Sequence, residues 1–170
     1  TPWILGPSPS ERSQEPCSRV SLERASGIQV KFWDASALIP LYIEGPQTRA
    51  IRAIAKADGD FVAWWGSPIE CYSAFARLRR EGFLKPKEED QIRHLLDLLV
   101  DAWTEIEPGT EIRVIAARLL LAHPLRAADS LQLAAGLMWT GTTPRGHHFV
   151  CLDDRLRSAA RTEGFTLLPA

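Results

Sequence analysis

Four carboxylate side chains lie where the sequence changes from a strand pattern to a helix pattern. They are Asp34, Glu70, Asp129 and Asp153. Hard cations such as Mg²⁺ and Mn²⁺ prefer oxygen ligands, which carboxylates supply. A protein that gathers carboxylates around such an ion generally uses it for phosphate chemistry. The four positions therefore predict a divalent metal site that acts on phosphate.

Each of three carboxylates also has a simpler structural explanation. Glu70 follows Ser67 by three residues, the spacing of a capping box in which the glutamate accepts a hydrogen bond from the serine backbone amide. Asp153 could cap the last helix, and Asp34 could cap a helix or form an Asx turn. These explanations can hold together, but they do not predict that all the side chains meet at one edge of a sheet.

Asp129 is the hardest of the four to explain by capping. It lies in a largely apolar helix expected over residues 126–139, between Ala128 and Leu131. A charge on such a helix is rarely buried without a partner. Arg126 at helical spacing is one candidate partner, and a metal shared with the other acids is the alternative. Because crowded like charges repel, a cation would also make the whole cluster tolerable.

The segments that position these acids alternate between strand and helix patterns. Strands are expected over residues 28–33, 61–65, 105–107, 148–152 and 165–168, and helices over residues 37–43, 47–57, 67–81, 87–103, 109–121, 126–139 and 154–163. This alternation predicts an α/β fold with a mainly parallel sheet, which binds ligands at the carboxyl ends of its strands. Asp34 and Asp153 directly follow strands, and Glu70 lies one turn into a helix that follows another.

The composition is that of an ordinary globular protein, with 45% hydrophobic and 24% charged residues in a chain of 170. Lys and Arg total 20 against 21 Asp and Glu, so a surface for nucleic acid would have to be local. Three cysteines without a CxxC pair argue against a disulfide framework or a zinc knuckle and favour a reducing cytoplasm. No apolar run is long enough to span a bilayer.

The first 27 residues differ from the remainder because they are rich in proline and serine. We expect residues 1–27 to be a flexible extension, or translated sequence upstream of the true domain start, and residues 28–170 to be one folded domain.

Each of the four acids lies in a short motif of its own. The sequence has WDASALI at 33–39, SPIE at 67–70, LRAADSLQLA at 125–134 and CLDDRL at 151–156. The ordered set resembles the PIN-domain ribonucleases, and most closely the VapC-type toxins of bacterial and archaeal toxin–antitoxin pairs. The resemblance covers about residues 28–170. The family often has Thr or Ser where Cys151 stands, and residues 1–27 have no counterpart in the usual short toxin.

The resemblance implies a PIN-like three-layer sandwich with a central, mainly parallel sheet flanked by helices. It also implies a toxin of a type II toxin–antitoxin system, a hydrolase that cleaves RNA endonucleolytically and leaves a 5′-phosphate. Asp34, Glu70, Asp129 and Asp153 would bind one or two Mg²⁺ or Mn²⁺ ions, which activate water and stabilise charge on the phosphate. The implied partners are RNA, a cognate VapB-type antitoxin and a second copy of the chain in a homodimer, in the cytoplasm and without a membrane.

Several choices stay open at this level. A non-catalytic PIN-like module that binds RNA or protein is the alternative function. A phosphatase of the haloacid dehalogenase type is disfavoured, because its second acid would stand where Ser36 is. Ser36 would be a helix-cap hydroxyl or hold a metal-bound water, and Asp154 competes with Asp153 as a ligand. Two basic clusters could contact phosphates or simply be solvated helix faces: Arg77, Arg79, Arg80, Lys85 and Lys87, and then Arg155, Arg157 and Arg161.

Overall fold

A central parallel sheet organises the protein. The computed structural model describes residues 30–57 and 60–170, so the predicted extension at 1–27 and the predicted domain start at 28 lie outside the described residues. Within them, the strands are β1 Lys31–Trp33, β2 Phe61–Trp64, β3 Thr104–Ile106, β4 His148–Val150 and β5 Thr166–Leu168. They lie in the order β3-β2-β1-β4-β5, and every neighbouring pair is parallel. The predicted short strand at 105–107 is the edge strand β3.

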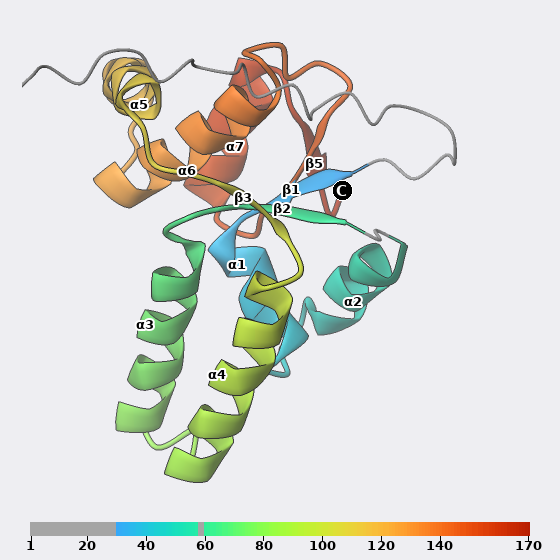
Figure 1. Cartoon of the computed structure of the whole chain (residues 1–170). Helices are drawn as coiled ribbons and strands as arrows, with labels where there is room; N and C mark the ends of the chain where they lie inside the picture. The colour runs from blue at the N-terminus through green and yellow to red at the C-terminus, as the bar shows by residue number, and fades with distance from the viewer. Residues whose placement is uncertain (1–29, 58–59) are drawn as a thin grey trace, which may run out of the picture.

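Helices cover both faces of the sheet (Figure 1). They are α1 Ala35–Leu38, the 3-10 helix η1 Ile39–Leu41, α2 Thr48–Ala57, α3 Ser67–Arg80, α4 Pro86–Val100, α5 Thr110–Ala122, α6 Ala127–Trp139 and α7 Asp154–Glu163. Helices α1 to α4 lie below the sheet in Figure 1, and α5 to α7 lie above it. The predicted three-layer α/β sandwich is confirmed. No helix of the described residues is long and apolar enough to cross a membrane.

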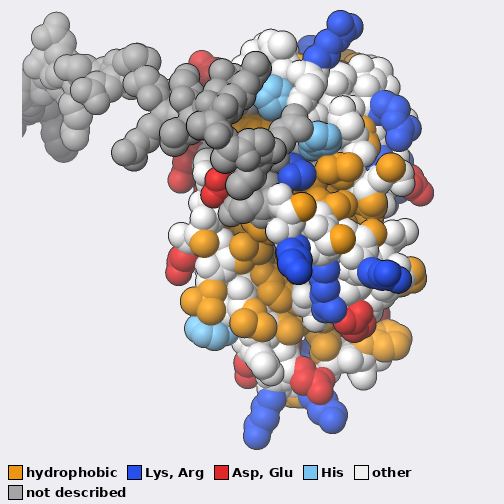
Figure 2. Space-filling view, turned by 90° about the vertical axis from the view of Figure 1, so that its right-hand side faces the viewer, with side chains coloured by type: hydrophobic (Ala, Val, Ile, Leu, Met, Phe, Trp, Pro, Cys, Tyr) orange, Lys and Arg blue, Asp and Glu red, His pale blue; other side chains and the backbone are white. Residues whose placement is uncertain are grey.

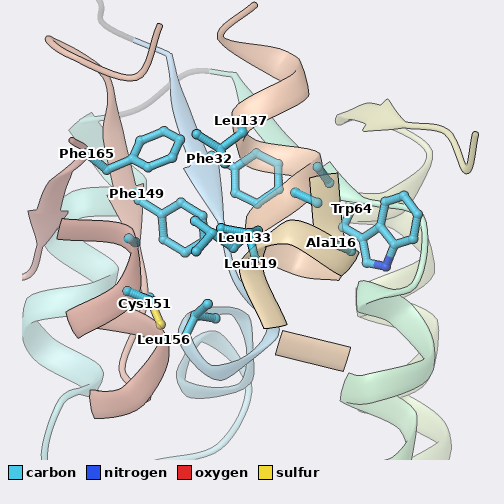
Figure 3. Packing of buried hydrophobic residues seen from close by; sticks show 14 of the residues in the cluster. Phe32, Trp64, Ala116, Leu119, Leu133, Leu137, Phe149, Cys151, Leu156 and Phe165 are labelled. Carbon is cyan, nitrogen blue, oxygen red and sulfur yellow. The ribbon is translucent and has the colours of Figure 1, made fainter. Parts of the chain in front are cut away.

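Alternate residues of the strands pack into two separate hydrophobic cores, as expected for strands covered on both faces. Phe32 and Phe149 stack at 5.1 Å between ring centroids on the side of α5 to α7, where most of the labelled side chains of Figure 3 pack. Trp33 and Val150 belong to the core on the side of α1 to α4. Gly136 lets α6 approach the sheet closely, because a Cβ there would lie 3.0 Å from the Phe149 ring.

The strand order fixes where a ligand can bind. The chain builds β1, β2 and β3 outward in one direction, and then returns through α5 and α6 to place β4 and β5 on the other side of β1. The order therefore reverses between β1 and β4, and in parallel sheets such a switch point is where ligands generally bind, at the carboxyl ends of the strands. Asp34 directly follows β1, and Asp153 follows β4 by three residues.

Two local predictions differ from the structure at the ends of elements. The helix expected at 37–43 starts earlier, at Ala35, and continues as η1 through Pro40, which has no amide to donate within a helix. Trp65, expected at the end of a buried strand, lies beyond β2 and is 51% exposed.

Candidate active site at the switch point of the sheet

Asp34 is the most enclosed of the four acids. Its side chain is buried, with the residue only 4% exposed, and it caps the first turn of α1. The Ser36 amide donates to Asp34 Oδ2 at 3.0 Å, the Ser36 hydroxyl donates to the same oxygen, and the Cys151 thiol lies 3.4 Å from it. Burial raises the pKa of Asp34, an effect that the hydrogen bonds from Ser36 and Cys151 partly offset and the charge of Asp129 reinforces.

Ser36 and Cys151 tie Asp34 to the segment that follows β4. The Leu152 amide donates to the Ser36 hydroxyl oxygen at 2.9 Å, so this hydroxyl joins α1 to the loop before α7. Burial, followed by the charge of Asp34, raises the pKa of the Cys151 thiol. Cys151 is therefore a protonated donor at neutral pH. Ser36 holds Asp34 in place rather than capping a helix itself.

Glu70 lies half-buried in the first turn of α3, facing the same edge. Burial raises the pKa of Glu70 from its ordinary 4.5 to about 7, and the charges of Asp34 and Asp129 add to this rise. A carboxyl group reaches such a pKa when it is desolvated and when other acids stand close by. The charges of Asp34 and Asp129 therefore act on Glu70, so these three acids interact electrostatically.

The predicted capping box at Ser67 is wrong. The N-cap of α3 is Gly66, and Ser67 is already the first helical residue. The Ser67 hydroxyl is fully buried and donates to Gln132 Oε1 at 3.2 Å instead of capping the helix. Capping thus no longer explains why a glutamate stands at position 70.

At Asp129, unlike at Glu70, the helix cap does form. Asp129 was expected inside an apolar helix at 126–139, and α6 begins one residue later, at Ala127, so Asp129 lies in its first turn and is half-buried. Its Oδ2 accepts a hydrogen bond from the Arg126 backbone amide at 3.2 Å. Capping therefore accounts for an acid at this helix start, and the role of Asp129 as a metal ligand stays a prediction. Its charge nevertheless raises the pKa of both Asp34 and Glu70, in addition to the larger effect of burial.

Asp153 has a different environment from the other three acids. It is exposed, and its Oδ1 accepts from the Leu156 amide at 2.9 Å as the N-cap of α7. Cys151 links it loosely to the cluster, since the thiol lies 3.7 Å from the Asp153 backbone oxygen and also contacts Asp34. Asp154, the alternative ligand, is exposed as the first residue of α7.

The acids have the chemistry of a magnesium site but are not assembled as one. Carboxylate oxygens suit Mg²⁺ or Mn²⁺, and crowding of partly desolvated carboxylates favours a cation between them. Across residues 30–57 and 60–170, however, no three His, Cys, Asp or Glu side chains stand close enough to hold one ion as they are. The donor types fit the ion, and side-chain movement would be needed to close around it.

Gln132 was missed by the sequence analysis. It lies on α6, one turn after Asp129, and its side chain is fully buried. Besides accepting from Ser67, it donates through Nε2 to the Trp33 carbonyl oxygen at 3.3 Å. Its only signal in the sequence was a lone amide in an otherwise apolar stretch of helix.

Two of the basic residues that could contact phosphates instead make contacts within the protein. Arg79 forms an ion pair with buried Glu89 at 2.9 Å. Arg157 donates to the backbone oxygens of Cys151 at 2.6 Å and Pro169 at 2.8 Å, joining α7 to the end of the chain. On the face drawn in Figure 2, Lys and Arg side chains lie scattered among hydrophobic ones over the visible described residues. These observations favour the solvated or structural interpretation for Arg79 and Arg157.

The comparisons with known proteins find likeness in three dimensions. No family model matches the sequence. No curated protein matches it either. The solved structure of a toxin–antitoxin complex from Klebsiella pneumoniae aligns with a TM-score of 0.51 and 14% identity, over 72% of this chain and 86% of that one. The crystal structure of FitAcB from Neisseria gonorrhoeae aligns with a TM-score of 0.56 and 15% identity, over 81% of this chain and 97% of that one. The fold is PIN-like. At these identities the likeness establishes the fold alone.

Proposed function

We propose that this protein is a Mg²⁺- or Mn²⁺-dependent endoribonuclease that acts as the toxin of a type II toxin–antitoxin pair. The observation that carries the proposal is the grouping of Asp34, Glu70 and Asp129 near the switch point of the sheet, where burial raises the pKa of Asp34 and Glu70 and the charge of Asp129 raises both further. Such perturbed acids at a ligand-binding position are a signature of a functional site. A structural role leaves this crowding unexplained, whereas a bound cation would relieve it.

The chain's own residues would prepare the site for the ion. When bound, the ion would activate a water and stabilise charge on the phosphate. Hydrogen bonds from Ser36 and Cys151 converge on Asp34 Oδ2 and fix that carboxylate, so Oδ1 is the oxygen offered to a cation. Glu70, with a pKa raised to about 7, would release its proton as the cation binds. Asp153 would offer its Oδ2 to the ion in the same way as Asp34 offers Oδ1, because only its Oδ1 accepts from the Leu156 amide.

The proposed partners are RNA, a small VapB-type antitoxin and a second copy of the chain, in the cytoplasm. One of the structural neighbours is itself a toxin–antitoxin complex, which supports a protein partner. Large hydrophobic side chains are also exposed on α3 and α4 and next to them, which is a feature of protein-binding surfaces. They are Trp65, Ile69, Phe83, Leu95 and Leu98.

A second function has one observation in its favour. Because the acids of the described residues are not preassembled around an ion, a non-catalytic PIN-like module that binds RNA or protein is the alternative. The two functions differ in one measurable property, which is cleavage of RNA in the presence of Mg²⁺.

The test is incubation of the purified full chain with total RNA. We expect cleavage with Mg²⁺, none with excess EDTA and recovery with Mn²⁺. Asp34→Ala should abolish cleavage because it removes the central ligand, while Asp101→Ala, which changes an exposed acid at the end of α4, should cut like the wild type. Intact RNA with the wild-type chain, or full activity of Asp34→Ala in Mg²⁺, would overturn the proposed endoribonuclease.

A further inference from the structure

A single buried amide connects the three segments that carry the clustered acids. The Gln132 side chain on α6 accepts from the Ser67 hydroxyl on α3 and donates to the Trp33 carbonyl oxygen at the end of β1. All three residues are 0% exposed. The contacts span 65 and 99 positions of the chain, so they join segments that no local structure would hold together.

These two hydrogen bonds of Gln132, here called the bridge, end next to acids. Trp33 immediately precedes Asp34, and Ser67 precedes Glu70 by one helical turn. Gln132 itself follows Asp129 by one turn of α6. Residues three apart on a helix lie on the same side of it, so the turn that bears each acid is tied directly to the bridge.

We propose that Gln132 is a positioning residue that holds Asp34, Glu70 and Asp129 at the mutual spacing from which they close on a divalent cation. This inference rests on the proposed function and concerns how the same site is built. Gln132 does not itself touch the ion or the RNA, and it acts through Ser67 and the backbone at Trp33.

The bridge requires an amide in particular. The Trp33 carbonyl can only accept a hydrogen bond, so it must face the NH₂ group, and the Ser67 hydroxyl donates to the amide oxygen. A carboxylate lacks the donor, and a methionine of similar shape lacks both groups. Loss of the Gln132 amide would leave the Ser67 hydroxyl and the Trp33 carbonyl buried without this partner. This favours local rearrangement of the segments that bear the acids.

The test compares Gln132→Met with the wild-type chain in three measurements. Hydrogen–deuterium exchange without metal should become faster in segments 34–38 and 67–71. Binding of Mn²⁺, followed by electron paramagnetic resonance, should weaken about 10-fold, and kcat for RNA cleavage should fall about 10-fold or more. KM for RNA should stay within about twofold, because the substrate contacts are not altered.

The matched control is Ser130→Ala on the same helix. Ser130 is also buried, but its hydroxyl donates within α6, to the Ala127 carbonyl at 2.8 Å. This variant loses a buried hydrogen bond without touching the bridge, so Mn²⁺ affinity and kcat should both be retained. If Gln132→Met does not fold, Ser67→Ala removes only the Ser67–Gln132 hydrogen bond, with a smaller loss of stability. It should show the same three changes in smaller size.

Failure of the proposed function and failure of the positioning role give different results. A wild-type chain that neither binds Mn²⁺ nor cuts RNA contradicts the proposed function, and the exchange measurement then still decides whether Gln132 holds the two segments. Unchanged exchange in both segments, or Mn²⁺ affinity and kcat that Gln132→Met and Ser130→Ala lower equally, overturns the positioning role.

Discussion

At the scale of single residues, the same sequence spacing produced two different structures. Ser67 and Glu70 have the spacing of a capping box but do not form one, because the buried Gln132 amide takes the serine hydroxyl. Arg126 and Asp129 have the same spacing, and there the carboxylate does accept from the backbone amide. The sequence could predict which acids lie at helix starts, but not which of them would be free of capping.

The raised pKa of Glu70 predicts a pH dependence of stability in protein without divalent ions. The folded chain keeps a proton on Glu70 up to about pH 7, whereas the unfolded chain releases it near 4.5. The stability that Glu70 contributes is therefore complete below about pH 4.5 and is lost as the pH rises through about 7. Glu70→Gln should remove this loss, so its free energy of unfolding relative to wild type should increase from pH 4.5 to 7.

Urea unfolding across that pH range measures the difference. The variant Glu107→Gln, which changes an exposed carboxylate after β3, corrects for the general effect of removing one negative charge. A difference between Glu70→Gln and wild type that stays constant or shrinks from pH 4.5 to 7 would show that Glu70 is not desolvated beside other acids.

At the scale of helices and strands, the sequence predicted most elements because their signals are local. The strand expected at 61–65 is β2 Phe61–Trp64, and the helix expected at 154–163 is α7 Asp154–Glu163. Periodicity and turn residues decide these, within a residue or two at each end. The contacts of Gln132 were not predictable, because they join residues far apart in the chain and leave no spacing pattern.

The hairpin of α3 and α4 depends on one buried acid. Glu89 on α4 is 4% exposed and pairs with Arg79 on α3 at 2.9 Å and with Arg93 at 2.7 Å. Glu89→Gln should lower the free energy of unfolding by about 1–2 kcal/mol, because charge-assisted hydrogen bonds are lost and both arginines can still reach water. Urea unfolding at neutral pH measures this change.

The control for the hairpin is Asp90→Asn on the same helix. Asp90 is exposed, so the loss of the same charge should change the free energy of unfolding by no more than about 0.5 kcal/mol. Equal effects of Glu89→Gln and Asp90→Asn would mean that the ion pairs do not join α3 to α4.

At the scale of the whole molecule, strand order brings Asp34 and Asp153, which are far apart in the sequence, to the carboxyl ends of the neighbouring strands β1 and β4. The sequence predicted a parallel sheet with acids after its strands, and that expectation placed Asp34 at the switch point between β1 and β4. It did not separate Asp153, which is exposed as a helix cap, from Glu70, whose pKa is raised by burial and by the charges of Asp34 and Asp129. Burial decides that difference, and burial depends on how α3 and α6 pack against the sheet.

The most direct test of the metal-dependent nuclease is the rate at which Asp34→Asn cleaves RNA in Mg²⁺ under single-turnover conditions. Asparagine caps helices as well as aspartate does, so the first turn of α1 should be retained while the negative charge is lost. We expect the cleavage rate to fall at least about 100-fold, with a thermal unfolding curve like that of the wild type. A folded Asp34→Asn variant that cuts RNA at the wild-type rate would contradict a catalytic metal site at this switch point.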